Sequence, residues 1–476
     1  MSVLVNLFKY HKIPLLFILL SSILYLSFAY DLVRTDTTKL LFLYLALFVF
    51  AFQIIKTTGF YFKLLIISAL LFRVLFIFSI PNLSQDFYRF IWDGRMILGG
   101  FNPYLYRPDL FIQNGELLIA QSQELYNGMG SLSASHFTNY PPINQLCFAI
   151  AALLTGKSIL GSVVVLRILI IAADIGTLYF GKKLLERLKL PSNRIFWYIL
   201  NPFIIIELTG NLHFEGVMIF FLVWSLYLLH CGKWKWAAIL LACSISVKLI
   251  PLLFLPLFFW WFRKGGKESL IANEVKLSVS KDKIATSQIT RIDLSKLILF
   301  YAIIGITILL FFLPFLSMEF INNYSQTIGL WFGKFEFNAS IYYLAREIGF
   351  ITTGFNEIVF IEKVLPLVSV LIILGFSFFK HNNTIPKLTT SMLLAFTCYL
   401  FLSTTVHPWY IAMLVILCVF TDYKFPLVWS LAVILSYLAY ANTSNSENLW
   451  IIGLEYLIVF TAFVWEVLIK KRLPVS

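Results

Sequence analysis

Two acidic side chains and an arginine lie close together in the first quarter of the chain. Asp86, Arg89 and Asp93 are spaced so that they share one face of a helix, together with Phe90. One carboxylate could take the proton of an attacking hydroxyl while the other positions the substrate. The alternative is a salt-bridge ladder that only stabilises the helix, and from spacing alone the ladder is the more common outcome.

Lys248 is a lone cation within the long apolar segment 237–262, which also contains Pro251 and Pro256. A charge at membrane depth costs about 2.5 to 3.5 kcal/mol on insertion scales. We therefore expect an anionic partner, which would be a ligand phosphate or an acid such as Asp174 or Glu215. The alternative is that the lysine reaches the membrane surface along its aliphatic stem.

Polar and aromatic residues also occupy turns between apolar segments. His213 and Glu215 lie in one such turn, and His407, Trp409 and Tyr410 lie in another. Titratable groups at such turns are typical of functional sites, so we predict that these residues bind substrate, with Asp93, Arg89 and the loop residue Tyr104. The alternatives are a capped loop around His213 and an aromatic anchor at the membrane interface around Trp409.

The composition sets the class of protein that must position these residues. Of 476 residues, 60% are hydrophobic and 13% are charged, and the mean hydropathy is +0.85. This excludes a cytosolic enzyme and predicts an all-α polytopic membrane protein, residues 1–476 forming one integral membrane domain with 11 to 15 segments. The net charge of +13 comes from Lys and Arg beside the apolar runs, so we expect membrane lipids and no nucleic acid as partners.

The distribution of basic residues predicts the orientation. The segment 82–140 has three Arg, no Lys and five acids, so we place the loop 81–142 outside. The polar linker 263–296 has eight basic and four acidic residues, and we expect it in the cytoplasm. The same rule makes the segment 237–262 a short hairpin with Lys248 near the outer face.

The sequence has no motif for a bound nucleotide or metal. There is no P-loop, no GxGxxG and no cluster of metal ligands, and the five cysteines are scattered. We therefore predict that no cofactor is required and assign no metal ligand, while a divalent metal stays open.

A family resemblance follows from an ordered set of short motifs between Ser84 and Pro256, together with one later turn. The motifs are Asp86-Phe-Tyr, Asp93-Gly-Arg, Phe101-Asn-Pro-Tyr-Leu, Tyr140-Pro-Pro, Leu200-Asn-Pro, Gly210-Asn, Val247-Lys-Leu-Ile-Pro and His407-Pro-Trp-Tyr. This order resembles the GT-C superfamily of polytopic glycosyltransferases, in particular the GPI first mannosyltransferase and bacterial relatives that use polyprenyl-phosphate mannose. No single one of these motifs is specific to that superfamily, but their order along the chain is.

The resemblance implies a function and a catalytic residue. The family's acidic motif is usually a pair two residues apart, but here the first position is Ser84, so Asp86 alone is the expected general base. The implied donor is a polyprenyl- or dolichyl-phosphate sugar, mannose being the expected sugar, and the acceptor is a hydroxyl of a lipid-linked or surface glycan. Lys248 would meet the donor phosphate. The active site would face away from the cytoplasm, in the plasma (inner) membrane of a bacterium or the ER membrane of a eukaryote.

Two other classes of function stay open on the sequence. A multi-pass lipid or sugar transporter, or flippase, would use Lys248, Asp174 and Arg167 as a pathway, although the two related halves typical of many transporters are not visible. A structural alternative for Arg167 and Asp174 is pairing with neighbouring helices, which we favour. The third class is a non-catalytic membrane assembly subunit.

Overall fold

A computed structural model describes residues 12–58, 61–115, 119–262, 293–330, 335–441 and 446–470. Within these ranges the chain is helical, and its only extended pairing is an isolated bridge between Phe337 and Thr405. Among the described residues, seven helices are long and apolar enough to cross a membrane, or eight if the bent pair is counted as one span. Five shorter apolar helices accompany them. The predicted class, an all-α polytopic membrane protein, is confirmed.

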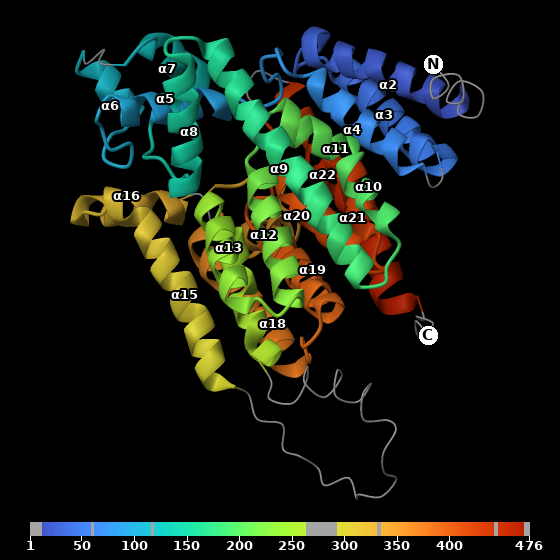
Figure 1. The fold of residues 1–476 in the computed structure, drawn as a ribbon. Helices are drawn as coiled ribbons and strands as arrows, with labels where there is room; N and C mark the ends of the chain where they lie inside the picture. The colour runs from blue at the N-terminus through green and yellow to red at the C-terminus, as the bar shows by residue number, and fades with distance from the viewer. Residues whose placement is uncertain are drawn as a thin grey trace, which may run out of the picture.

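The N-terminal half begins with three helices and continues with a layer of four at one end of the molecule (Figure 1). The first three are α2 (Lys12–Asp31), α3 (Thr37–Thr58) and α4 (Phe62–Val74), and the layer contains α5 (Asp86–Leu98), α6 (Pro108–Gln113), α7 (Ser122–Ala134) and α8 (Pro142–Thr155). Gly94 lets α5 pack directly on α8, because a Cβ atom there would lie 2.2 Å from the carbonyl oxygen of Phe148. This close approach explains the glycine of the Asp93-Gly-Arg motif.

The long helix α9 (Ile159–Arg187) joins this layer to the opposite end of the bundle (Figure 1). Its Asp174 forms a buried ion pair with Arg73 of α4, with 2.7 Å between Oδ2 and Nε. Arg167 donates to four backbone carbonyls, those of Ile77, Ser79, Thr209 and Gly210. The structural interpretation of both residues is confirmed, since each holds neighbouring segments together.

The segment 192–210 is not one continuous helix but is broken into short pieces. It is made of the 3-10 turn η1 (Ser192–Ile195), α10 (Phe196–Ile199), α11 (Pro202–Ile204) and the π-helical η2 (Ile205–Gly210). Pro202 starts a new helix because Asn201 caps it, accepting the N–H of Phe203 at 3.0 Å. The following α12 (Glu215–His230) is bent by 115° from the piece before it.

The hairpin predicted around Lys248 is present. Helix α13 (Trp234–Val247) ends at Lys248, whose backbone is extended, and the 3-10 helix η3 (Ile250–Phe262) returns along it. The rings of Trp234 and Phe262, at the two far ends, are 5.7 Å apart. Lys248 therefore lies at the tip of the hairpin.

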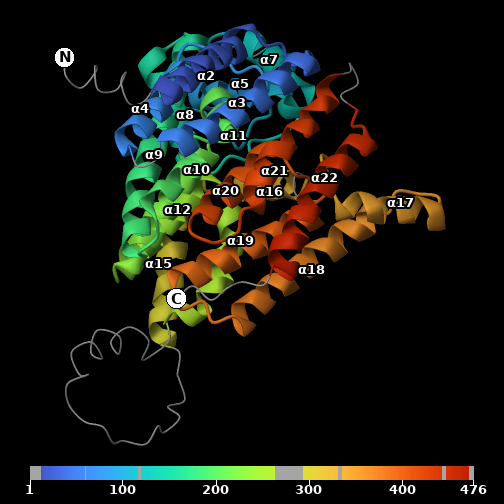
Figure 2. The same cartoon turned by 90° about the vertical axis from the view of Figure 1, so that its right-hand side faces the viewer.

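The C-terminal half completes the bundle. Its helices are α15 (Leu294–Phe312), η4 (Leu313–Phe315), α16 (Met318–Gly329), α17 (Ile341–Thr353), α18 (Ile358–Phe379), α19 (Ile385–Leu402), η6 (Pro408–Tyr410), α20 (Ile411–Val419), α21 (Phe425–Ala432), η7 (Val433–Ala441), α22 (Leu449–Val464) and η8 (Trp465–Ile469). Helix α16 lies across the end of α15 beneath the α5–α8 layer (Figure 1), and α17 projects sideways beyond the start of α18 (Figure 2). The start of α15 lies at the end opposite that layer (Figure 1). Most of the predicted linker, 263–292, lies outside the described residues.

Candidate active site

A cavity of about 540 Å³ lies where the α5–α8 layer meets the hairpin tip and the C-terminal half. Six of the ten predicted site residues line it, namely Asp86, Arg89, Lys248, His407, Trp409 and Tyr410. These residues come from segments more than 300 positions apart in the chain. The fold therefore brings the outer-loop acid, the lone lysine and the aromatic turn to one site.

Asp86 is the first residue of α5, at the cavity wall. Its backbone N–H donates to the Ser84 hydroxyl at 3.3 Å, and the Tyr140 hydroxyl donates to its Oδ2 at 3.4 Å. Burial raises the pKa of the Asp86 carboxyl above its ordinary value, and the Lys248 charge and the Tyr140 hydroxyl offset part of that rise. Among the described residues no cation lies within ion-pair distance of Asp86, so the carboxylate is available to accept a proton.

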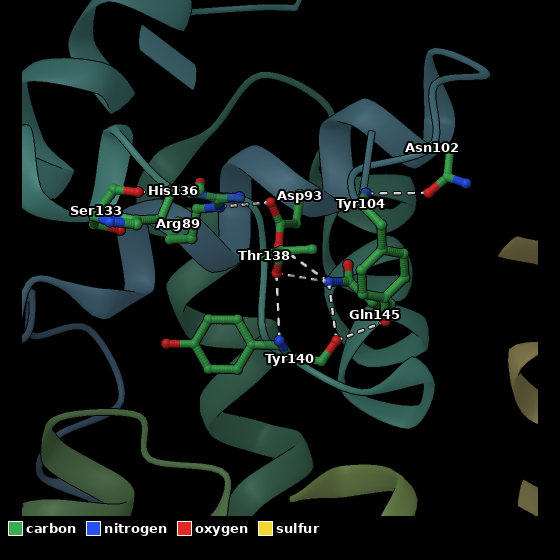
Figure 3. Close-up of polar contacts among 9 residues, drawn as sticks. All are labelled: Arg89, Asp93, Asn102, Tyr104, Ser133, His136, Thr138, Tyr140 and Gln145. Atoms are coloured by element: carbon green, nitrogen blue, oxygen red, sulfur yellow. Dashed lines mark hydrogen bonds and ion pairs between the residues drawn. The ribbon is translucent and has the colours of Figure 1, made fainter. Parts of the chain in front are cut away.

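Asp93 has a different environment from Asp86. Arg89 Nε lies 2.8 Å from its Oδ1, and Gln145 Nε2 donates to its Oδ2 at 3.0 Å, so that both approach it as Figure 3 shows. Arg89 also donates to the carbonyls of Ser133 and His136, each at 2.9 Å. The Arg89–Asp93 half of the salt-bridge ladder is therefore present, while Asp86 is not part of it. Asp93 is fully buried and does not line the cavity.

Lys248 has a protein partner. Its Nζ lies 3.2 Å from Oε1 of Glu215, the first residue of α12, and 4.9 Å from the centre of the Tyr140 ring. The Lys248 side chain is 18% exposed, whereas Glu215 is fully buried and lies behind the cavity wall. The predicted anionic partner of Lys248 is thus an acid of the protein, and the lysine still faces the cavity.

The two predicted turns meet in a column of stacked groups. Trp409 is stacked between His213, at 3.8 Å between ring centres, and His407, at 4.6 Å. Phe337 continues the column at 5.5 Å from His407, and Tyr440 follows at 6.1 Å from Phe337. Arg34 closes the column, with its guanidinium carbon 4.1 Å from the centre of the Tyr440 ring. All of these except His213 line the cavity.

Tyr104 lies outside the cavity lining and has a supporting position. It is buried, and its hydroxyl donates to the carbonyl of Tyr140 at 2.6 Å (Figure 3). Its ring packs against Phe320 and Tyr324, at 5.0 and 5.5 Å between centres. Tyr104 thus holds in place the residue that donates to Asp86.

The cavity lining also includes residues that the sequence analysis did not identify, among them Arg34, Glu336, Tyr440 and Glu447. Glu336 pairs with Arg346, at 2.6 Å between Oε2 and Nη1. Glu447 accepts the backbone N–H of Asn338 at 2.7 Å and the Tyr343 hydroxyl. Arg34, Glu336 and Glu447 lie in separate loops and Tyr440 lies in η7, and none of the four belongs to a motif, so no local signal marked them. Within the described ranges, no three His, Cys, Asp or Glu side chains are grouped to hold a metal ion.

The fold and the cavity define a class: a polytopic membrane protein whose titratable residues converge at one end of a helical bundle. Residues 20–264, more than half of the chain, match the family model described as alpha-(1->6)-mannopyranosyltransferase, N-terminal domain. The chain belongs to this family, which confirms the resemblance to GT-C mannosyltransferases seen in the motifs.

Two curated relatives are similar to the chain over a shorter stretch. Alpha-(1->6)-mannopyranosyltransferase A of Mycobacterium tuberculosis is 22% identical over 187 residues, which cover 39% of this chain and 34% of the relative. The protein of the same description from Corynebacterium glutamicum is 24% identical over 185 residues, covering 39% and 36%. The similarity thus spans about a third of the length of the curated relatives. Arg34, Asp86 and Lys248 lie within the family-matched part, and His407, Tyr440 and Glu447 lie beyond it.

Proposed function

We propose that this protein is a membrane mannosyltransferase that moves mannose from a polyprenyl-phosphate donor to a hydroxyl of a lipid-linked or surface glycan. Family membership supports the transfer of mannose. The observation that carries the catalytic assignment is the position of Asp86, a half-buried carboxylate that faces a 540 Å³ cavity without a paired cation among the described residues.

The reaction needs one base at this cavity. The acceptor oxygen attacks the anomeric carbon of the donor mannose and its proton passes to Asp86. The bond between the anomeric carbon and the phosphate oxygen breaks, and its electron pair leaves with the polyprenyl phosphate. Because this leaving group is a stable phosphate, it needs little help from a general acid. A cation near the phosphate stabilises the charge that builds there.

The position of the cavity supports an active site on the non-cytoplasmic face. The cavity lies under the α5–α8 layer, which carries the acid-rich, lysine-free segment 82–140, and the start of α15 lies at the opposite end of the bundle. A transport pathway through Arg167 and Asp174 has less support, since both side chains are buried and committed to neighbouring helices.

The test compares Asp86→Asn with the wild-type protein in a transfer assay with radiolabelled polyprenyl-phosphate mannose. The variant keeps the shape of the side chain but removes the proton acceptor, so transfer should fall by about 10² to 10⁴ while the protein still inserts and folds. Asp109→Asn, an acid of the same layer outside the cavity, is the matched control and should leave transfer unchanged. Full activity of Asp86→Asn would overturn the assignment of the base.

A further inference from the structure

Among the described residues, three lysine and arginine side chains line the cavity, and they differ in how their charges are balanced. Lys248 is paired with Glu215, and Arg89 is paired with Asp93. The third, Arg34, follows α2 and has no ion pair with any described residue. Two of the three positive charges are thus already neutralised by buried carboxylates.

The acids beside Arg34 in the sequence are engaged elsewhere. Asp31 pairs with Lys39, at 2.5 Å between Oδ2 and Nζ, and Asp36 accepts the backbone N–H of Lys39 at 3.1 Å. Arg34 instead stacks on Tyr440, which fixes the plane of its guanidinium, and no acid of the described residues forms an ion pair with it. A guanidinium held by stacking can still present its N–H groups edge-on to a phosphate.

We propose that Arg34, rather than Lys248, is the residue that binds the phosphate of the lipid-linked donor. The inference rests on the proposed function and adds a specificity residue to it. An anionic ligand gains most from the cavity cation that has no counter-charge among the described residues, because a phosphate beside Lys248 would have to compete with the buried Glu215.

The stacked column gives the site its shape. Arg34 lies at one end of the column and His213 at the other, with Tyr440, Phe337, His407 and Trp409 between them. The faces of these rings are used in stacking, so that ring edges and their polar atoms are what remains for a ligand. A phosphate held at Arg34 would lie between the mannose and the polyprenyl chain of the donor.

The experiment measures binding of polyprenyl phosphate and of the uncharged polyprenol to the purified full-length protein in phosphatidylcholine nanodiscs. Wild-type protein should bind the phosphate more tightly than the alcohol. Arg34→Met should weaken binding of the phosphate by about 10- to 100-fold, the value expected for lost hydrogen bonds to a charged group, and leave binding of the alcohol unchanged. Arg34→Lys should restore part of the loss, and Arg107→Met, a guanidinium paired with Asp109 outside the cavity, should bind both ligands as the wild type does.

The outcomes separate this inference from the function on which it rests. If the wild type does not prefer the phosphate to the alcohol, the proposed donor is wrong. If the wild type prefers the phosphate and Arg34→Met keeps that preference, the assignment of Arg34 alone is overturned. Competition with inorganic phosphate and with phosphatidylglycerol identifies the source of the phosphate that the site binds. If phosphatidylglycerol displaces polyprenyl phosphate as well as unlabelled polyprenyl phosphate does, Arg34 is a general lipid contact and its role toward the donor is overturned.

Discussion

Lys248 at the tip of the α13–η3 hairpin and Glu215 at the start of α12 form an ion pair of 3.2 Å, with the lysine facing the cavity and the glutamate fully buried behind it. The pair holds the hairpin tip against the broken α11–α12 region. Lys248 therefore has a structural task as well as a place beside Asp86, whose carboxyl it influences electrostatically.

Removing either charge should show how much this ion pair contributes to the stability of the fold. Lys248→Met leaves the carboxylate of Glu215 buried without a partner, so we expect a loss of stability of about 3 to 5 kcal/mol. The double variant Lys248→Met/Glu215→Gln removes both charges and should recover most of the loss. Thermal unfolding in detergent, followed by tryptophan fluorescence, measures the three proteins side by side. Equal destabilisation of the single and the double variant would show that the pair has no coupling.

Asp93→Asn should destabilise the protein, whereas Asp86→Asn should not. Asp93 and Arg89 are both buried and paired, so Asp93→Asn leaves the Arg89 charge uncompensated and should cost about 3 to 5 kcal/mol. Asp86 forms no ion pair with a described cation, and burial disfavours its charge, so Asp86→Asn should leave stability unchanged or raise it. The same unfolding assay decides between them, and Asp109→Asn, which breaks a more exposed pair, should cost less than about 1 kcal/mol. A stable, fully folded Asp93→Asn protein with lost transfer would move the catalytic role to Asp93.

The sequence was sufficient to predict those features that depend on the local spacing of residues or on the free-energy cost of placing a charge in an apolar segment. The four-residue spacing of Arg89 and Asp93 predicted an ion pair that is present. The cost of a lone lysine in an apolar segment predicted an anionic partner for Lys248, and the basic flanks of the segment predicted the hairpin that has this lysine at its tip. Composition alone predicted the class of fold.

Features that depend on packing between distant segments could not be predicted. Arg34 reaches the cavity because Tyr440, some 400 residues later, supplies the ring on which it stacks. Glu447 reaches it through Asn338, whose loop is tied to the His407 turn by the Phe337–Thr405 bridge. Neither residue has a local pattern that distinguishes it from an ordinary loop charge.

The orientation of the bundle predicts the labelling of single cysteines on a background without the five native ones. Gln123 is exposed on α7, in the layer above the cavity, and Glu186 is exposed near the opposite end of α9. In intact cells, a membrane-impermeant maleimide should label Gln123→Cys and should label Glu186→Cys only after permeabilisation. The reverse pattern would place the cavity on the cytoplasmic face.

The dependence of transfer on pH should report the environment of Asp86. The base works as the carboxylate, and burial raises the pKa of this group, so transfer should fall on acidification at a higher pH than for an ordinary aspartate. The Tyr140 hydroxyl donates to the carboxylate and thereby lowers that pKa, so Tyr140→Phe should move the acid limb of kcat/KM to higher pH.

Tyr324→Phe is the matched control for this profile. It removes a hydroxyl that donates to the carbonyl of Asn139, at 3.4 Å, and that does not line the cavity. Its profile should coincide with that of the wild type. An acid limb that stays in place in Tyr140→Phe, or moves to lower pH, would show that the group titrating in the profile is not the Asp86 carboxyl beside Tyr140, because loss of a donor to a carboxylate raises its pKa.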